Sequence, residues 1–137
     1  MLLILFCLLA RGVVGGDDVP ATTWAVTGAL PAWETHVLLD VGQSCGLTLE
    51  EQKLLLTIRR IENGGPGIEM GVASNYPRHR ARRHANRPEQ SLRVQAQWAA
   101  GTIKKHYSGD LYAFARTYCP PNWEHWARMA RYWMNQE

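Results

Sequence analysis

The clearest periodic pattern of apolar and polar positions lies between residues 48 and 63. The apolar side chains recur there at intervals of three and four, which is the spacing of one face of a helix. Thr48 and Glu51 form a capping-box sequence at the start, and Gly64 and Gly65 are expected to supply the positive φ that ends a helix. We therefore predict a helix from Thr48 to Asn63 whose apolar face consists of Leu54, Leu55, Ile58 and Ile61.

Shorter patterns of the same kind predict further helices. One covers Ala32 to Gly42, and a longer one begins near Pro88, a residue that suits the first helical turn. Asp110 is expected to cap a third helix, which ends before Pro120 because proline cannot continue a helix. A last amphipathic segment follows Asn122, which is expected to cap it.

No segment shows the two-residue alternation of a β-strand, and residues 64–87 are rich in glycine and proline. A loop of this length inside a domain is usually functional. We therefore predict a small all-α domain of about four or five helices, with a long loop after the 48–63 helix. The chain is divided into an apolar leader at 1–16, a linker or lead-in at 17–40 and the helical domain at 41–137.

The apolar run at residues 2–10 is too short to span a bilayer as an ordinary helix and has the size of a signal-peptide core. We expect an exported protein, periplasmic or associated with the cell envelope, with no stable transmembrane span. An uncleaved anchor or a buried hydrophobic N-terminus is the alternative. Without the leader, Cys45 and Cys119 remain, and they either form a disulfide or stay as free thiols.

The composition of the 137 residues, with 46% hydrophobic and 20% charged, describes a soluble globular protein. The net charge of +3 suits an anionic partner such as a cell-wall polymer or a nucleic acid. Six tryptophans serve either as core fillers or as surfaces on which sugars stack. No spacing of cysteine and histidine indicates a zinc site, so we expect no metal and no cofactor.

Five arginines lie between residues 78 and 87 and are able to neutralise phosphates. The segment lacks interleaved aromatic side chains and a recognisable nucleic-acid fold, so we expect no nucleic-acid partner. The same arginines also suit teichoic or muramyl carboxylates, or a solvated loop.

Glu62 is the strongest candidate for chemistry. It lies near the end of the 48–63 helix, at the edge of the apolar face, where loss of hydration favours the protonated carboxyl. Cleavage of a glycosidic bond needs a proton donor of this kind, because the leaving sugar oxygen is protonated as the bond breaks. An ordinary helix-surface ion pair between Arg59 and Glu62 is the alternative.

The order of these segments resembles the catalytic domain of the soluble-type lytic transglycosylases, within the lysozyme-like superfamily. Glu62-Asn63-Gly64-Gly65 stands where that family has Glu-Ser-Gly-Gly, and residues 68–72 are the nearest match to its Gly-Leu-Met-Gln. Residues 116–120 occupy the place of its Ala-Tyr-Asn-Ala-Gly-Pro, and residues 88–111 resemble its middle helices. The resemblance covers about residues 45–134. The glutamine of the second motif is missing, and a cysteine replaces Asn-Ala-Gly in the third.

The resemblance implies a peptidoglycan-cleaving enzyme that acts on the bond between N-acetylmuramic acid and N-acetylglucosamine. Glu62 would protonate the glycosidic oxygen and then act as the base on the muramyl 6-hydroxyl, which gives a 1,6-anhydro product. Asn63, Met70 and Gly71 would bind substrate, the last two through backbone groups that line the acetamido pocket. Tyr118 would hold Glu62 by a hydrogen bond. Met70 and Tyr118 are alternatively packing residues of the core.

Two other functions stay open on the same fold. A hydrolytic lysozyme would need a second acid or a bound water, and Glu69 is the only acid near Glu62 in the sequence. A catalytically inactive module would bind peptidoglycan strands, or act as a structural protein, without cleaving them.

Overall fold

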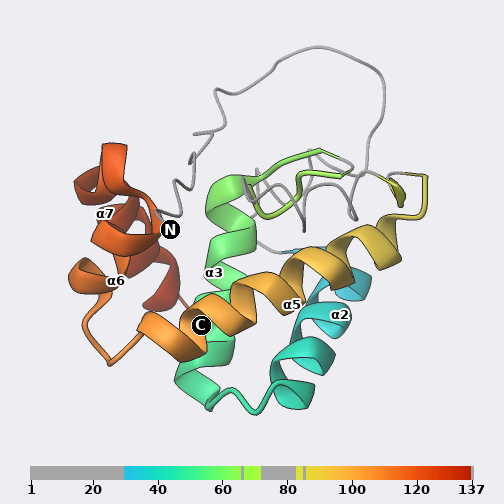
Figure 1. Ribbon diagram of the computed structural model, residues 1–137, viewed down its shortest axis with the longest axis horizontal. Helices are drawn as coiled ribbons and strands as arrows, with labels where there is room; N and C mark the ends of the chain where they lie inside the picture. The colour runs from blue at the N-terminus through green and yellow to red at the C-terminus, as the bar shows by residue number, and fades with distance from the viewer. Residues whose placement is uncertain (1–29, 66, 72–82, 85, 137) are drawn as a thin grey trace.

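The computed structural model describes residues 30–65, 67–71, 83–84 and 86–136, and these contain helices and no strand (Figure 1). The prediction of a small all-α domain of four or five helices is confirmed for this part of the chain. Its elements are α2 (Ala32–Ser44), α3 (Leu49–Glu62), α5 (Pro88–His106), α6 (Leu111–Tyr118), the 3-10 turn η1 (Pro120–Asn122) and α7 (Trp123–Met134).

Helix α3 is the centre of the arrangement and packs against α2, α5 and α7 (Figure 1). Helix α5 lies across α3 and also contacts α2, whereas α6 and α7 pack together at the other side of α3. Because α3 has neighbours on several sides, its predicted apolar face is fully buried. The largest buried apolar side chains of the core are Leu38, Leu54, Leu55, Ile58, Met70, Leu92, Ile103, Phe114, Tyr118 and Trp126.

Two of the three helix N-caps expected from the sequence are formed, those of α3 and α6. The Thr48 hydroxyl accepts a bond from the Glu51 backbone at 3.2 Å, and the Glu51 carboxylate accepts one from the Thr48 backbone at 2.8 Å. Asp110 accepts bonds from the backbone N–H groups of the first turn of α6. The expected cap of α7 is wrong, because the Asn122 side chain forms no capping hydrogen bond.

The end of α3 differs from the sequence prediction. Asn63, not a glycine, takes the left-handed conformation, with φ at 40°. Neither Gly64 nor Gly65 has positive φ. Gly64 is required for another reason, since a Cβ there would lie 1.8 Å from the carbonyl oxygen of Ile68. The chain therefore turns back sharply after α3, and its close backbone contact leaves no room for a side chain at residue 64.

Helix α2 begins inside the segment that the domain division assigned to the lead-in. Val37 and Leu38 of this helix are buried in the core, so residues 32–40 belong to the helical domain. The apolar leader at 1–16 and most of the arginine-rich segment 78–87 lie outside the described residues. Within the described ranges, no helix is both long and apolar enough to cross a membrane.

The two cysteines left open by the sequence do not pair with each other. Cys45, at the end of α2, carries a free thiol. Cys119 is buried at the end of α6 and is disulfide-bonded. The structure therefore matches neither a Cys45–Cys119 bridge nor two free thiols.

Candidate active site

Glu62 is the last residue of α3, and its side chain points into the protein. Only 3% of the residue is exposed. Loss of hydration raises the pKa of its carboxyl to about 8, because burial penalises the charged form. The expectation that Glu62 loses its hydration is therefore supported by the fold. A carboxyl in this state holds a proton at neutral pH and is able to donate it.

Trp126 of α7 supplies the hydrogen bond that holds Glu62. Its indole N–H donates to Oε1 of Glu62 at 3.2 Å. This bond favours the carboxylate and lowers the pKa, but the effect of burial is larger. Trp126 is not among the site residues expected from the sequence. The available signal was its place on the apolar face of the last helix, where a buried indole N–H needs an acceptor.

Gly71 packs against the other oxygen of the same carboxyl. A Cβ at this position would lie 2.1 Å from Oε2 and 2.7 Å from Cδ of Glu62, and φ of Gly71 is +63°. Both facts require glycine here. Oε2 itself is buried and has no hydrogen-bond partner in the part of the chain that the structure describes. Gly71 thus belongs to the site, through its lack of a side chain.

Tyr118 lies in the site but does not form the expected hydrogen bond. Its ring is stacked on Phe114 and packs beside Trp126, with ring centroids 5.2 Å apart in both pairs. Its hydroxyl has no partner among the described residues. Burial, and then the nearby charge of Glu62, raise the pKa of Tyr118 well above its usual value. The bond predicted from Tyr118 is made by Trp126 instead.

Asn63 and Met70 occupy structural positions beside Glu62. Asn63 is the C-cap of α3, and its backbone N–H donates to the Arg59 carbonyl at 3.1 Å. The Met70 side chain is fully buried in the core, which agrees with the packing alternative. Its backbone N–H donates to Gln95 Oε1 at 2.9 Å, so that group is already engaged within the protein.

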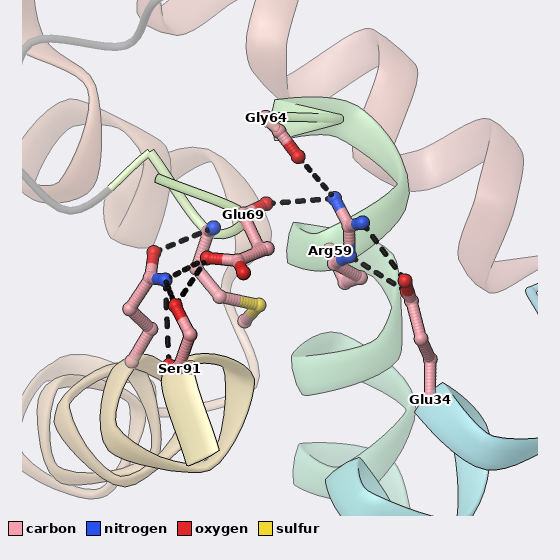
Figure 2. Close-up of polar contacts among 7 residues, drawn as sticks. Glu34, Arg59, Gly64, Glu69 and Ser91 are labelled. Carbon is pink, nitrogen blue, oxygen red and sulfur yellow. Dashed lines mark hydrogen bonds and ion pairs between the residues drawn. The ribbon is translucent and has the colours of Figure 1, made fainter. Parts of the chain in front are cut away.

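Arg59 forms its ion pair with Glu34 of α2, and not with Glu62 (Figure 2). Its Nε and Nη2 donate to the two carboxylate oxygens of Glu34 at 2.8 and 3.0 Å. Among the described residues, Glu62 has no ion-pair partner, and none of their charged groups contributes to its pKa shift. The helix-surface ion pair considered from the sequence is therefore not formed.

Glu69 is turned toward α5 (Figure 2). Its carboxylate accepts a bond from the Ser91 hydroxyl at 3.0 Å and a second from the Gln95 side-chain amide. The residue is buried. Its carboxylate is thus used to attach the loop to α5. Sequence reasoning missed Glu34, Ser91 and Gln95, because the contacts they make join segments more than 20 residues apart.

In the described ranges, no group of three or more histidine, cysteine, aspartate or glutamate side chains is placed to hold a metal ion. What the site offers chemically is one buried carboxyl at the end of α3, with a pKa raised to about 8. Comparison of the chain with protein-family models, with curated proteins and with solved structures gives no significant match. The assignment of a function therefore depends on the geometry around Glu62 and on the motif order.

Proposed function

We propose that this protein cleaves the glycan strands of peptidoglycan with Glu62 as its single acid–base residue. The observation that carries the proposal is the buried Glu62 carboxyl, which has no ion-pair partner among the described residues and a pKa raised to about 8. Ordinary buried carboxylates are paired with a cation, as Glu34 is with Arg59, or accept several hydrogen bonds, as Glu69 does from Ser91 and Gln95. An unpaired, protonated glutamate at a helix end is what a general acid requires.

The reaction needs no water in the proposed mechanism. Glu62 gives its proton to the glycosidic oxygen as the bond from C1 of N-acetylmuramic acid breaks. The resulting carboxylate then takes the proton of the muramyl 6-hydroxyl, whose oxygen bonds to C1 and closes the 1,6-anhydro ring. Glu62 ends as it began, protonated. The Trp126 indole orients one carboxyl oxygen, while Oε2, beside Gly71, has no hydrogen-bond partner among the described residues and is the proposed proton donor.

The second acid of a hydrolytic lysozyme has no candidate beside Glu62 in the described residues. Glu69 is engaged by Ser91 and Gln95, which supports the single-glutamate mechanism over a two-carboxylate one. The inactive wall-binding module is the second candidate function. The observation that favours it is the near-complete burial of Glu62, because a glycan must reach Oε2 before a proton is transferred.

The test is product analysis with the full chain. Purified peptidoglycan is incubated with the wild-type protein, with Glu62→Gln and with Glu124→Gln, a control at an exposed acid of α7. Released muropeptides are identified by mass spectrometry. We expect anhydro-muramyl products from the wild type and the control and none from Glu62→Gln. Reducing-end products would establish a lysozyme, and binding without release would establish the inactive module. Release by Glu62→Gln would exclude Glu62 as the acid.

A further inference from the structure

The short segment after α3 turns back to contact the Glu62 carboxyl at Gly71, and it is held from two sides along the way. We call residues 63–65 and 67–71 the return loop. On the side of α5, Ser91 and Gln95 bind the loop through the Glu69 carboxylate and the Met70 backbone (Figure 2). On the side of α3, the Arg59 guanidinium donates to two loop carbonyls, those of Gly64 at 3.3 Å and Glu69 at 2.9 Å.

Arg59 is itself fixed by Glu34. The fork of two bonds between the guanidinium and the Glu34 carboxylate leaves the two side chains only 6% and 7% exposed. A bidentate pair of this kind fixes the plane of the guanidinium as well as its position. The remaining Nη1 is thereby directed at the return loop, and α2 is connected through one side chain to the backbone beside Glu62 (Figure 2).

The two carbonyls bound by Arg59 determine where Gly71 lies. Gly64 and Glu69 are also joined to each other, since the Gly64 N–H faces the Glu69 carbonyl at 3.4 Å. The Gly71 N–H donates to Ile68 at 3.0 Å, which closes a turn around residues 69 and 70. A loop fixed at its second and seventh residues, Gly64 and Glu69, therefore brings Gly71 into contact with the Glu62 carboxyl.

We propose that Arg59, oriented by Glu34, is a positioning residue that holds the return loop against the carboxyl of Glu62 and keeps water from it. The catalytic consequence of this role rests on the proposed function, whereas the contact itself does not. Burial of a salt bridge contributes little net stability compared with apolar side chains of the same volume. A pair kept in the core at such small benefit is better explained by the position it gives to the loop.

The groups around Glu62 indicate that its protonation is controlled by burial under the return loop and not by a neighbouring charge. On its own helix, Arg59 points to Glu34, and in the return loop the Glu69 carboxylate points to α5. The nearest groups of α6 and α7 are the neutral Tyr118 and Trp126. Removal of Arg59 from the loop therefore acts on Glu62 through access of water.

The experiment measures the titration of the Glu62 carboxyl by NMR in protein with ¹³C-labelled glutamate. The variants are Arg59→Lys, which keeps a charge beside Glu34 but loses the fork, and the double variant Glu34→Leu with Arg59→Met, which replaces the pair by apolar side chains of similar size. The control is Asp40→Asn with Arg93→Gln, which removes a partly exposed ion pair between α2 and α5, together with the contact of Arg93 with Glu89. We expect the Glu62 pKa to fall by about one unit or more in both Arg59 variants and to be unchanged in the control.

An unchanged Glu62 pKa in folded Arg59 variants would overturn the proposal. Failure of both variants to fold would also overturn it, because the pair would then be a general requirement of the fold. The result is independent of the proposed function, since the titration needs no glycan. If the wild type releases no muropeptides but the titration shifts, the positioning role stands and the cleavage function fails. If muropeptides are released and the titration does not shift, the cleavage function stands and the positioning role fails.

Discussion

At the scale of single residues, the central feature is a carboxyl that the fold buries without compensating its charge. One oxygen of Glu62 accepts a bond from Trp126, and the other faces Gly71 without a partner among the described residues. A buried carboxylate without a cation is costly, so the carboxyl stays protonated at neutral pH, as its pKa of about 8 indicates. The neighbours of Glu62 that lack charge therefore matter as much as the residue itself.

Gly71→Ala tests the contact on Oε2. The new methyl group would overlap the carboxyl, and an alanine at φ +63° is strained by about 1–2 kcal/mol. We expect the Glu62 side chain to be displaced and muropeptide release to fall at least tenfold, with a modest loss of thermal stability. Gly65→Ala is the matched control, because a Cβ there meets no atom of the described residues within 4 Å. Equal activity of the two variants would contradict the role of Gly71.

Trp126→Phe tests the hydrogen bond to Oε1. The bond lowers the pKa of Glu62, so its removal is expected to raise that pKa further, while the phenyl ring keeps part of the contacts with Phe114 and Tyr118. The smaller ring also costs stability, on the order of 1–3 kcal/mol. The measurement is the ¹³C titration of Glu62. A lower pKa in Trp126→Phe would show that water has replaced the indole and that Trp126 acts mainly by exclusion.

At the scale of elements, α3 determines where Glu62 lies. The capping box fixes its first turn, and Asn63 fixes its last. Helices α2, α5 and α7 pack around it, so each contributes one residue that the site depends on: Glu34, Gln95 and Trp126, respectively.

Thr48→Ala tests whether the start of α3 and its catalytic end are independent. The loss of an N-cap costs about 1 kcal/mol of the free energy of unfolding. The capping box lies at the opposite end of the helix from Glu62, so we expect lower thermal stability with no change in the Glu62 titration. A shifted Glu62 pKa in this variant would indicate that fraying at the first turn reaches the site. Thermal unfolding and the NMR titration on one sample provide both readouts.

The helices were predictable where the sequence signal lies within one helical turn. The structure confirms three such signals: the Thr48–Glu51 capping box, Pro88 at the start of α5 and the Asp110 cap. Asn63 was missed because a double glycine beside it gave a stronger signal for positive φ. The steric need for glycine at position 64 was invisible, since it depends on the path of the chain four residues later.

Of the site residues, only Glu62 was predictable from the pattern of a single helix. Glu62 was found because its place on the apolar face is a property of one helix. Trp126 is 64 residues away from Glu62, and Glu34 is 25 residues from Arg59, so their contacts follow from packing alone. Tyr118 was placed near Glu62 by the family resemblance, but the detail of the bond was wrong because Trp126 is the donor.

At the scale of the whole molecule, polar groups of α2, α3, the return loop and α5 form a framework within the mainly apolar core. It includes the Glu34–Arg59 pair, the Glu69 carboxylate and Gln95. Glu62 is separate from this framework and bonded only to Trp126 among the described residues. The fold thus distinguishes two kinds of buried glutamate. Glu34 and Glu69 are bound by an arginine or by hydrogen-bond donors, whereas Glu62 is kept neutral by its own proton.

The stability of the whole protein is expected to depend on pH through Glu62. Its pKa in the folded state is raised from 4.5 to about 8, so the folded protein binds this proton more tightly than the unfolded chain does. The contribution is fully present below pH 4.5 and is lost as the pH rises through 8, with an upper limit of about 5 kcal/mol. Glu62→Gln should abolish this fall. Urea unfolding at pH 5, 7 and 9 measures it, and parallel curves for the wild type and Glu62→Gln would contradict the raised pKa.

The most direct test of Glu62 as the general acid is the pH dependence of muropeptide release by the full chain, measured beside the titration of Glu62 in the same protein. A general acid must be protonated to act, so we expect a rate that falls as the pH rises through about 8, with the same midpoint as the carboxyl. The Trp126→Phe variant should move both midpoints together. A rate that is unchanged across this range, while Glu62 titrates within it, would contradict the assignment of Glu62 as the acid.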